Sequence, residues 1–278
     1  MKSLIIIGIF AVLAFSILAL AKPDLTPSLI DVSPSHGKAK VVIPENAVEV
    51  SPGIFSLGTA IDKGRIVEGY AFVHYKNKDE KGKNNAVRGS KGTGSCYAFL
   101  SSGARWKITE KYILDSSNSD GLTESFVAGK TEEGMNAWDS EVGFDIFGER
   151  NLTSSVNRTE IGKLNGKNEI FFDSLSDQNT IAVTIVWGIF GGPPFGRELV
   201  EFDMIFNDNS FAFGDADLNS QVMDYLNIFT HEIGHGAGMG HPSDFCTEET
   251  MFRYASLGET KKRTLEIGDK TGIKALYP

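Results

Sequence analysis

Histidine, cysteine and basic residues are all scarce in this sequence. Five histidines and two cysteines occur in 278 residues, and 36 acidic residues outnumber 27 lysines and arginines, for a net charge of −9. This balance argues against a general nucleic-acid binder, which needs an excess of basic side chains to displace counterions from a phosphate backbone. After residue 20, no apolar run is long enough to cross a bilayer. The scarcity of histidine makes its distribution informative, because three of the five lie within residues 230–241.

The N-terminus carries the one long hydrophobic stretch. Lys2 precedes a largely apolar run over residues 4–20, which ends in Ala19-Leu20-Ala21. A basic start, a hydrophobic stretch and a small-x-small site are typical of a secretory signal peptide, here residues 1–21. An uncleaved membrane anchor is the alternative. Both interpretations predict an exported, extracellular protein, either secreted or tethered by this segment.

A polar segment divides the exported part of the chain. Residues 22–75 are interpreted as a small β-rich N-terminal region or propeptide, with two strands around an Asp62-Lys63-Gly64 turn. Residues 76–95 are charged and glycine-rich, as in a linker or an exposed loop. Residues 96–278 combine strand and helix patterns and are predicted to form one compact domain.

Strand patterns dominate the first half of residues 96–278. A half-buried strand is expected over 105–114 and a helix over 121–140, and Asn165-Gly166 suits a hairpin turn. The continuous apolar run at 180–187 predicts a central strand that is covered on both faces. The acidic residues of "ELVEFDMIF" (198–206) favour a strand at the edge of the sheet.

Two helices are expected towards the C-terminus. One begins at an Asn219 or Ser220 cap and continues into "THEIGHGAG", and the other is a short final helix capped by Asp269.

The histidine cluster "HEIGHGAGMGH" has the spacing of a metal site. His231 and His235 are four residues apart, so a helix places both imidazoles on one face, within reach of one zinc ion. Gly238 can end the helix in a left-handed conformation and turn the chain, so that His241 arrives as a third ligand. Three protein ligands leave one position open, which is typical of a catalytic rather than a structural zinc. Glu232 lies where its carboxylate can act on a metal-bound water as general base.

The motif His-Glu-x-x-His-x-x-Gly-x-x-His resembles that of the metzincin metallopeptidases, and the chain is most similar to the matrixins. "NTIAVTIVWG", "EFDMIFND" and "GDKTGIKALYP" resemble matrixin segments in the same order, and Met251 lies where metzincins have a methionine turn beneath the metal. The resemblance covers about residues 96–278. It implies an α+β catalytic domain with a twisted mixed β-sheet, a zinc-ligand helix and a C-terminal helix.

The chain also departs from the matrixin pattern. No histidine is left in the region for the second, structural zinc of matrixins, so one zinc is expected. Calcium is possible at Asp215-x-Asp217-x-Asn219, although a helix-capping turn explains these residues equally well. The matrixin latency motif Pro-Arg-Cys-Gly is absent.

The two cysteines are predicted to pair, because thiols of exported proteins tend to oxidise and both lie in or beside the matrixin-like region. Two alternatives stay open for the disulfide between Cys96 and Cys246. Cys96 could block the zinc of a precursor as a thiolate, and Cys246 could be a fourth zinc ligand.

The sequence therefore predicts a secreted, monomeric zinc endopeptidase that acts on proteins or peptides, with Glu232 as its base. An extended substrate is expected to pair with the edge formed by "EFDMIFND". The alternative is a catalytically silent, zinc-bearing binding or adhesion module, against which the intact Glu232 argues.

Overall fold

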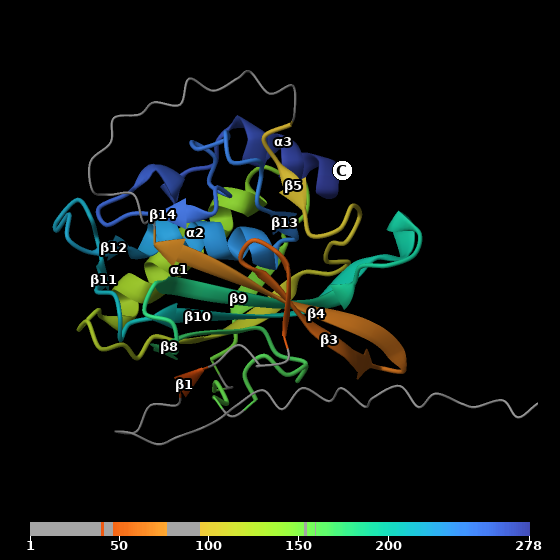
Figure 1. Cartoon of the computed structure of the whole chain (residues 1–278), viewed down its shortest axis with the longest axis horizontal. Coiled ribbons are helices and arrows are strands. Elements are labelled where there is room, and N and C mark those ends of the chain that lie inside the picture. Colours follow the sequence, from red (N-terminus) through yellow and green to blue (C-terminus); the bar gives the residue numbers. More distant parts are fainter. Residues whose placement is uncertain (1–39, 42–46, 77–94, 153–154, 159) are drawn as a thin grey trace, which may run out of the picture.

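The computed structural model describes residues 40–41, 47–76, 95–152, 155–158 and 160–278 (Figure 1). The expected signal peptide at residues 1–21 lies outside this part of the chain, and so does the expected linker apart from its two end residues. Within the described residues, no helix is long and apolar enough to span a membrane.

A mixed sheet organises the described part of the chain, with ten strands in it. Its main path has the order β2-β3-β4-β9-β10-β8-β6-β7, while β1 pairs with β8 and β14 pairs with β4. The strands are β1 (Lys40–Val41), β2 (Val48–Ser51), β3 (Ile54–Asp62), β4 (Arg65–Lys76), β6 (Glu110–Asp115), β7 (Phe147–Arg150), β8 (Glu169–Leu175), β9 (Thr180–Ile189), β10 (Glu198–Asn207) and β14 (Tyr254–Ala255).

Helices and two short strand pairs complete the described fold. The pairs are β5 (Ala98–Phe99) with β13 (Met239–Gly240), and β11 (Phe213–Gly214) with β12 (Met223–Asp224). The helices are α1 (Glu124–Asp139), α2 (Tyr225–Gly236) and α3 (Ile267–Leu276), with 3-10 turns at Pro194–Gly196 and Lys261–Arg263. The expected α+β fold with a mixed sheet, a histidine-bearing helix and a C-terminal helix is confirmed (Figure 1).

The N-terminal hairpin belongs to the same sheet as the strands that follow it. β3 and β4 meet at the expected turn, where Lys63 and Gly64 have φ angles of 47° and 81°. β4 then pairs antiparallel with β9, from Glu68 opposite Gly188 to Tyr75 opposite Thr180. The strands before residue 76, which we expected in a separate region, therefore extend the main sheet.

The prediction for β9 is confirmed and that for β10 is wrong. β9 lies between β4 and β10 and is buried along nearly its whole length, as its continuous apolar run predicted. β10 is not an edge strand, because it pairs antiparallel with β9 and parallel with β8. Its acidic residues Glu201 and Asp203 suggested an edge, but they are buried and accept from the backbone N–H groups of Asn165 and Gly162.

Three local predictions need correction. α2 begins at Tyr225, later than expected, because Asp224 is its cap and accepts from the backbone N–H of Asn227. α3 is capped by Glu266, and Asp269 is the reciprocal partner three residues on, in a capping box. Gly166 does lie in a turn, with φ of 76°, but no described strand precedes that turn to form a hairpin.

The two faces of the sheet have different covers. Helices α1 and α2 pack on one face, around a core that includes Trp138, Phe202, Phe206 and Phe229 (Figure 1). The other face is covered by Val156, Ile161, Leu164 and their neighbours, which pack on side chains such as Phe171 and Trp187. The histidine cluster lies on the helix face of the sheet.

Candidate metal centre

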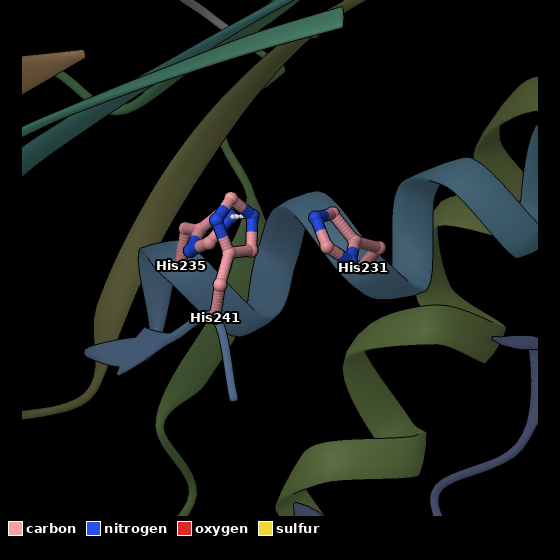
Figure 2. Close-up of side chains that lie close together, drawn as sticks. All are labelled: His231, His235 and His241. Carbon is pink, nitrogen blue, oxygen red and sulfur yellow. Dashed lines mark hydrogen bonds between the residues drawn. The ribbon is translucent and has the colours of Figure 1, made fainter. Parts of the chain in front are cut away.

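Helix α2 carries the first two histidines of the motif towards one point. Its cap at Asp224 starts the helix, and the helix ends at Gly236, two residues before Gly238. Gly238 has a φ of 101°, and a Cβ there would meet the carbonyl oxygen of Ala104 at 2.8 Å, so only glycine fits. The chain then turns through β13 and brings His241 back to the helix (Figure 2).

The three imidazoles have nitrogen atoms that converge within 4.8 Å of one another. The Nδ1 atoms of His231 and His235 donate to the carbonyl oxygens of Thr250 and Met239, at 2.7 and 2.9 Å. A carbonyl oxygen can only accept, so each Nδ1 carries the proton and each Nε2 keeps a lone pair. The sequence predicted the ligands but gave no sign of these carbonyl partners.

The geometry of these lone pairs fits a metal cation. The Nε2 of His231 is buried without a partner among the described residues, and so is the Nδ1 of His241. The Nε2 atoms of His235 and His241 face each other at 3.1 Å (Figure 2). Two imidazole nitrogens on one tetrahedral zinc would lie about 3.3 Å apart, given zinc–nitrogen bonds of about 2.0–2.1 Å. The three side chains therefore suit zinc, the ion that the matrixin pattern implies.

Burial keeps these imidazoles neutral. Loss of solvent lowers the pKa of His235 to about 4, and it lowers the pKa of His231 and His241 well below the ordinary value. Neutral imidazole is the form that binds metal, so the buried cluster is ready to accept zinc near neutral pH.

Glu232 is fully buried beside the histidines. Its Oε1 accepts from Nδ1 of His74 at 2.9 Å, and its Oε2 accepts from the hydroxyl of Thr184 at 2.5 Å. Burial raises the pKa of Glu232 to about 8, while the Thr184 hydrogen bond and the charge of Lys262 act in the opposite direction. His74, Thr184 and Lys262 were not predicted as site residues.

His74 is the clearest omission of the sequence reading. His74, His231 and Glu232 form a second group whose ligand atoms lie within 4.8 Å of one another. The signal was the spacing along the strand, since Phe72 and His74 are two residues apart and therefore share one face of β4. Placing residues 22–75 outside the catalytic region hid that signal.

Met251, the residue expected in a methionine turn, packs against Gly234 of α2. Its side chain is fully buried, and a Cβ on Gly234 would clash with its Sδ. Asp269 accepts from the backbone N–H groups of Thr250 and Met251 at 2.7 and 3.2 Å. The residue predicted as a helix cap therefore also fixes the turn whose Thr250 carbonyl orients His231.

Cys96 and Cys246 form a disulfide, with their Cα atoms 5.6 Å apart. This bond removes both alternatives, because neither sulfur remains as a thiolate for a metal. It ties the segment before β5 to the loop after His241.

The acidic turn suggested for calcium has an arginine partner instead. Arg263 donates to Asp215 at 2.7 Å and to Asp217 at 2.6 Å, and it also pairs with Asp224. Asn219 accepts from the backbone N–H of Gln221. The guanidinium supplies the positive charge, which removes the reason to expect calcium there.

Comparisons with known proteins gave a structural neighbour and a family match. The metalloproteinase-II from Bacteroides fragilis is similar in structure, with 12% identity, a TM-score of 0.34, and coverage of 82% of this chain and 77% of that one. No curated protein gave a match. The matrixin family model matches residues 105–278, which is more than half of the chain. The chain belongs to the matrixin family of zinc metallopeptidases.

Proposed function

We propose that this protein is a secreted, monomeric zinc endopeptidase with one zinc ion, which His231, His235 and His241 hold. The observation that carries the proposal is the convergence of their lone pairs, because the Nδ1 atoms of His231 and His235 are tied to backbone carbonyls. Zinc bound there would supply Lewis acidity towards a peptide carbonyl and would lower the pKa of a water molecule.

Glu232 is the proposed general base. It is next to a proposed ligand on α2, and the Thr184 hydroxyl fixes one of its oxygens. In that position the carboxylate takes a proton from the attacking water and delivers it to the leaving amine. Burial raises the pKa of Glu232 to about 8, and the Thr184 hydrogen bond and the charge of Lys262 offset only part of that rise. Met251 is proposed as a packing support for the histidines and not as a ligand.

The exported state and the processing of the chain belong to the same proposal. Residues 1–21 act as the signal peptide, and residues 22–95 comprise the N-terminal region and linker that precede the catalytic part at 96–278. The Cys96–Cys246 disulfide suits an oxidising compartment. A mature N-terminus near Gly92 would support a removed propeptide, whereas one near Lys22 would support a retained region.

The test uses the form isolated from the secreting cells, beside a Glu232→Ala variant. We expect one zinc per chain in both proteins, and a loss of peptide cleavage by about 10²–10⁴-fold in the variant. Equal cleavage by both would contradict the role of Glu232. One bound zinc and no cleavage by either mature protein would instead favour the zinc-bearing binding or adhesion module.

A further inference from the structure

A cavity of about 250 Å³ lies outside the histidine cluster, between the segment before β6 and the residues that follow α3. Its walls come from residues 105–107, 143–144 and 277–278, so none of the residues proposed to bind zinc lines it. Pockets for ligands of ordinary size have volumes of about 300–1,000 Å³, so this cavity suits a small ligand.

Two cationic side chains line the cavity. Arg105 and Lys107 flank the buried Trp106, and among the described residues neither forms a salt bridge. Arg105 donates from Nη1 to the carbonyl oxygen of Leu276 at 2.8 Å, which leaves most of its N–H groups for another acceptor. Partial burial and then the charge of Arg105 lower the pKa of Lys107, so the two positive charges act on each other.

The acidic side chains around the cavity already have partners. Glu198 raises the pKa of Lys107 but pairs with Arg65. Glu141, at the end of α1, pairs with two lysines of α3. The Oδ1 of Asp139 accepts from the backbone N–H of residue 146 at 3.0 Å. The cavity is therefore lined by positive charge, and charge complementarity favours an anionic ligand.

The remaining side chains of the cavity are largely aromatic. Phe144 and Tyr277 are stacked, with ring centroids 6.0 Å apart and an angle of 14° between the rings. Trp106 and Tyr277 are buried, whereas Phe144 is half-buried, so part of its ring is open to a ligand. An inorganic anion would contact the two cations alone. A carboxylate that is attached to an aromatic ring would use the cations and Phe144 together.

The buried wall of the cavity holds the end of α2. Trp106 donates its indole N–H to the carbonyl oxygen of Gly236 at 2.7 Å, and the Tyr277 hydroxyl donates to that of Ala237 at 2.9 Å. The same hydroxyl accepts from the backbone N–H of Trp106. Both carbonyl groups lie between the second and third histidines of the motif. A ligand that binds only while Trp106 and Tyr277 are in place therefore stabilises this turn by mass action.

We propose that this cavity binds a small carboxylate with an aromatic body, with Arg105 and Lys107 on the carboxylate and Phe144 against the ring. The bound ligand stabilises the turn before His241 and slows the release of zinc. This effect on zinc rests on the proposed zinc site, whereas the carboxylate site does not. The chemistry is shared by free aromatic acids and by the C-terminus of a peptide that ends in an aromatic residue.

The first experiment titrates the zinc-loaded protein isolated from the secreting cells. The probes are phenylacetate, N-acetylglycylphenylalanine, phenylacetamide and inorganic phosphate. Calorimetry measures each affinity, and the NMR signal of the Trp106 indole N–H locates the site. We expect both carboxylates to bind at least about tenfold more tightly than phenylacetamide and phosphate, and the tighter of the two identifies the source. Equal affinity for phenylacetamide would contradict the role of the cations, and equal affinity for phosphate would contradict that of the ring.

Variants test the two parts of the cavity. Lys107→Gln removes a cation that has no hydrogen bond or ion pair with a described residue, and Phe144→Ala removes the open ring. Lys111→Gln is the matched control, because it removes the same charge four residues on, outside the cavity. We expect the first two changes to weaken phenylacetate binding at least about fivefold and the control to leave it unchanged.

A carboxylate can also bind zinc directly, so the titration is repeated after a chelator has removed the metal. We expect phenylacetate still to bind and Lys107→Gln still to weaken it. Binding that disappears with the zinc and does not respond to Lys107→Gln would assign the ligand to the metal and overturn the carboxylate site.

The rate of zinc release to a chelating dye tests the coupling. At a concentration that nearly saturates the wild type, we expect phenylacetate to slow release at least about threefold, and to act more weakly on Lys107→Gln than on Lys111→Gln. Unchanged release with phenylacetate in the cavity would contradict the coupling. A protein that binds phenylacetate in the cavity but no zinc would support the carboxylate site and contradict the proposed metal centre.

Discussion

The two faces of the sheet both bury titratable side chains, and the comparison shows what distinguishes a site from a structural cluster. The helix face buries His231, Glu232 and His235, and the opposite face buries Glu201 and Asp203, each at most 1% exposed. Burial alone therefore does not separate the two groups.

The direction of the lone pairs does separate them. On the helix face, backbone carbonyls hold the Nδ1 atoms, and the remaining nitrogens converge. On the opposite face, Glu201 accepts from the backbone N–H groups of Asn165 and Lys167. Hydrogen bonds to a nearby loop therefore occupy its carboxylate. Among the described residues, these carboxylates do not form a metal-binding group. Lone pairs that receive no hydrogen bond and point towards one position indicate a binding site.

The electrostatic consequences have opposite signs. Burial lowers the pKa of His235 to about 4, whereas burial raises the pKa of Glu201 to about 7. The pKa of Asp203 is also raised, by burial and then by the neighbouring Glu201 and Glu169. Three predictions use this difference, in order of expected size.

The largest effect is expected on zinc affinity, when one of the converging histidines on the helix face is removed. His235→Ala removes one of three proposed ligands, and the zinc affinity should fall by more than about 100-fold. The loss of a residue that only orients a ligand usually lowers metal affinity by about 10–100-fold, so the loss of a ligand should exceed that range. A competition titration with a chelating dye measures this affinity. His36→Ala, which changes a histidine outside the motif, is the control. Unchanged zinc binding in His235→Ala would place the metal elsewhere.

Acid should destabilise the metal-free protein because it protonates the buried His235 on the helix face. The folded pKa of His235, about 4, lies below its ordinary value of 6.5, so the unfolded chain takes up the proton first as the pH falls. This contribution is complete above pH 6.5 and is lost towards pH 4, at up to about 3 kcal/mol for His235. Urea unfolding at pH 7, 6 and 5 measures the loss. A smaller loss is expected in His235→Ala, and an equal one would assign the effect to other groups.

A rise in pH should also lower the stability of the protein, through Glu201 on the opposite face, but by a smaller amount. The folded pKa of Glu201, about 7, lies above its ordinary value of 4.5, so its contribution is complete below pH 4.5 and is lost as the pH rises through 7. Glu201→Gln should flatten the fall in stability between pH 5 and 8 by about 2 kcal/mol. Glu198→Gln is the control, because Glu198 begins the same strand and pairs with Arg65 at a partly exposed position. Identical slopes in the two variants would contradict the assignment.

The local sequence determined those parts of the site that lie within a single helix or turn. The spacing of His231 and His235 follows from the pitch of a helix, and the left-handed glycine at 238 follows from the steric freedom of that residue. The central position of β9 followed from its continuous apolar run, since a strand that is covered on both faces tolerates few polar residues.

The acidic residues of β10 misled the sequence reading for a physical reason. A carboxylate in a strand usually indicates solvent, but here distant backbone N–H groups at residues 162 and 165–167 donate to Asp203 and Glu201. The later start of α2 has a similar origin, because β12 pairs with β11 and holds residues 223–224 extended. The N–H donors lie 34–41 residues from the carboxylates, whereas β11 lies ten residues before β12.

The sequence by itself determined which side chains are proposed to bind the metal, because the motif lies within one helix and one turn. Only the tertiary structure decided what lies over them. His74 is 158 residues from Glu232, and Lys262 is 188 residues from His74. These contacts arise because β4 pairs with β9, and strand pairing brings together segments whose separation along the chain leaves no periodic signal in the sequence.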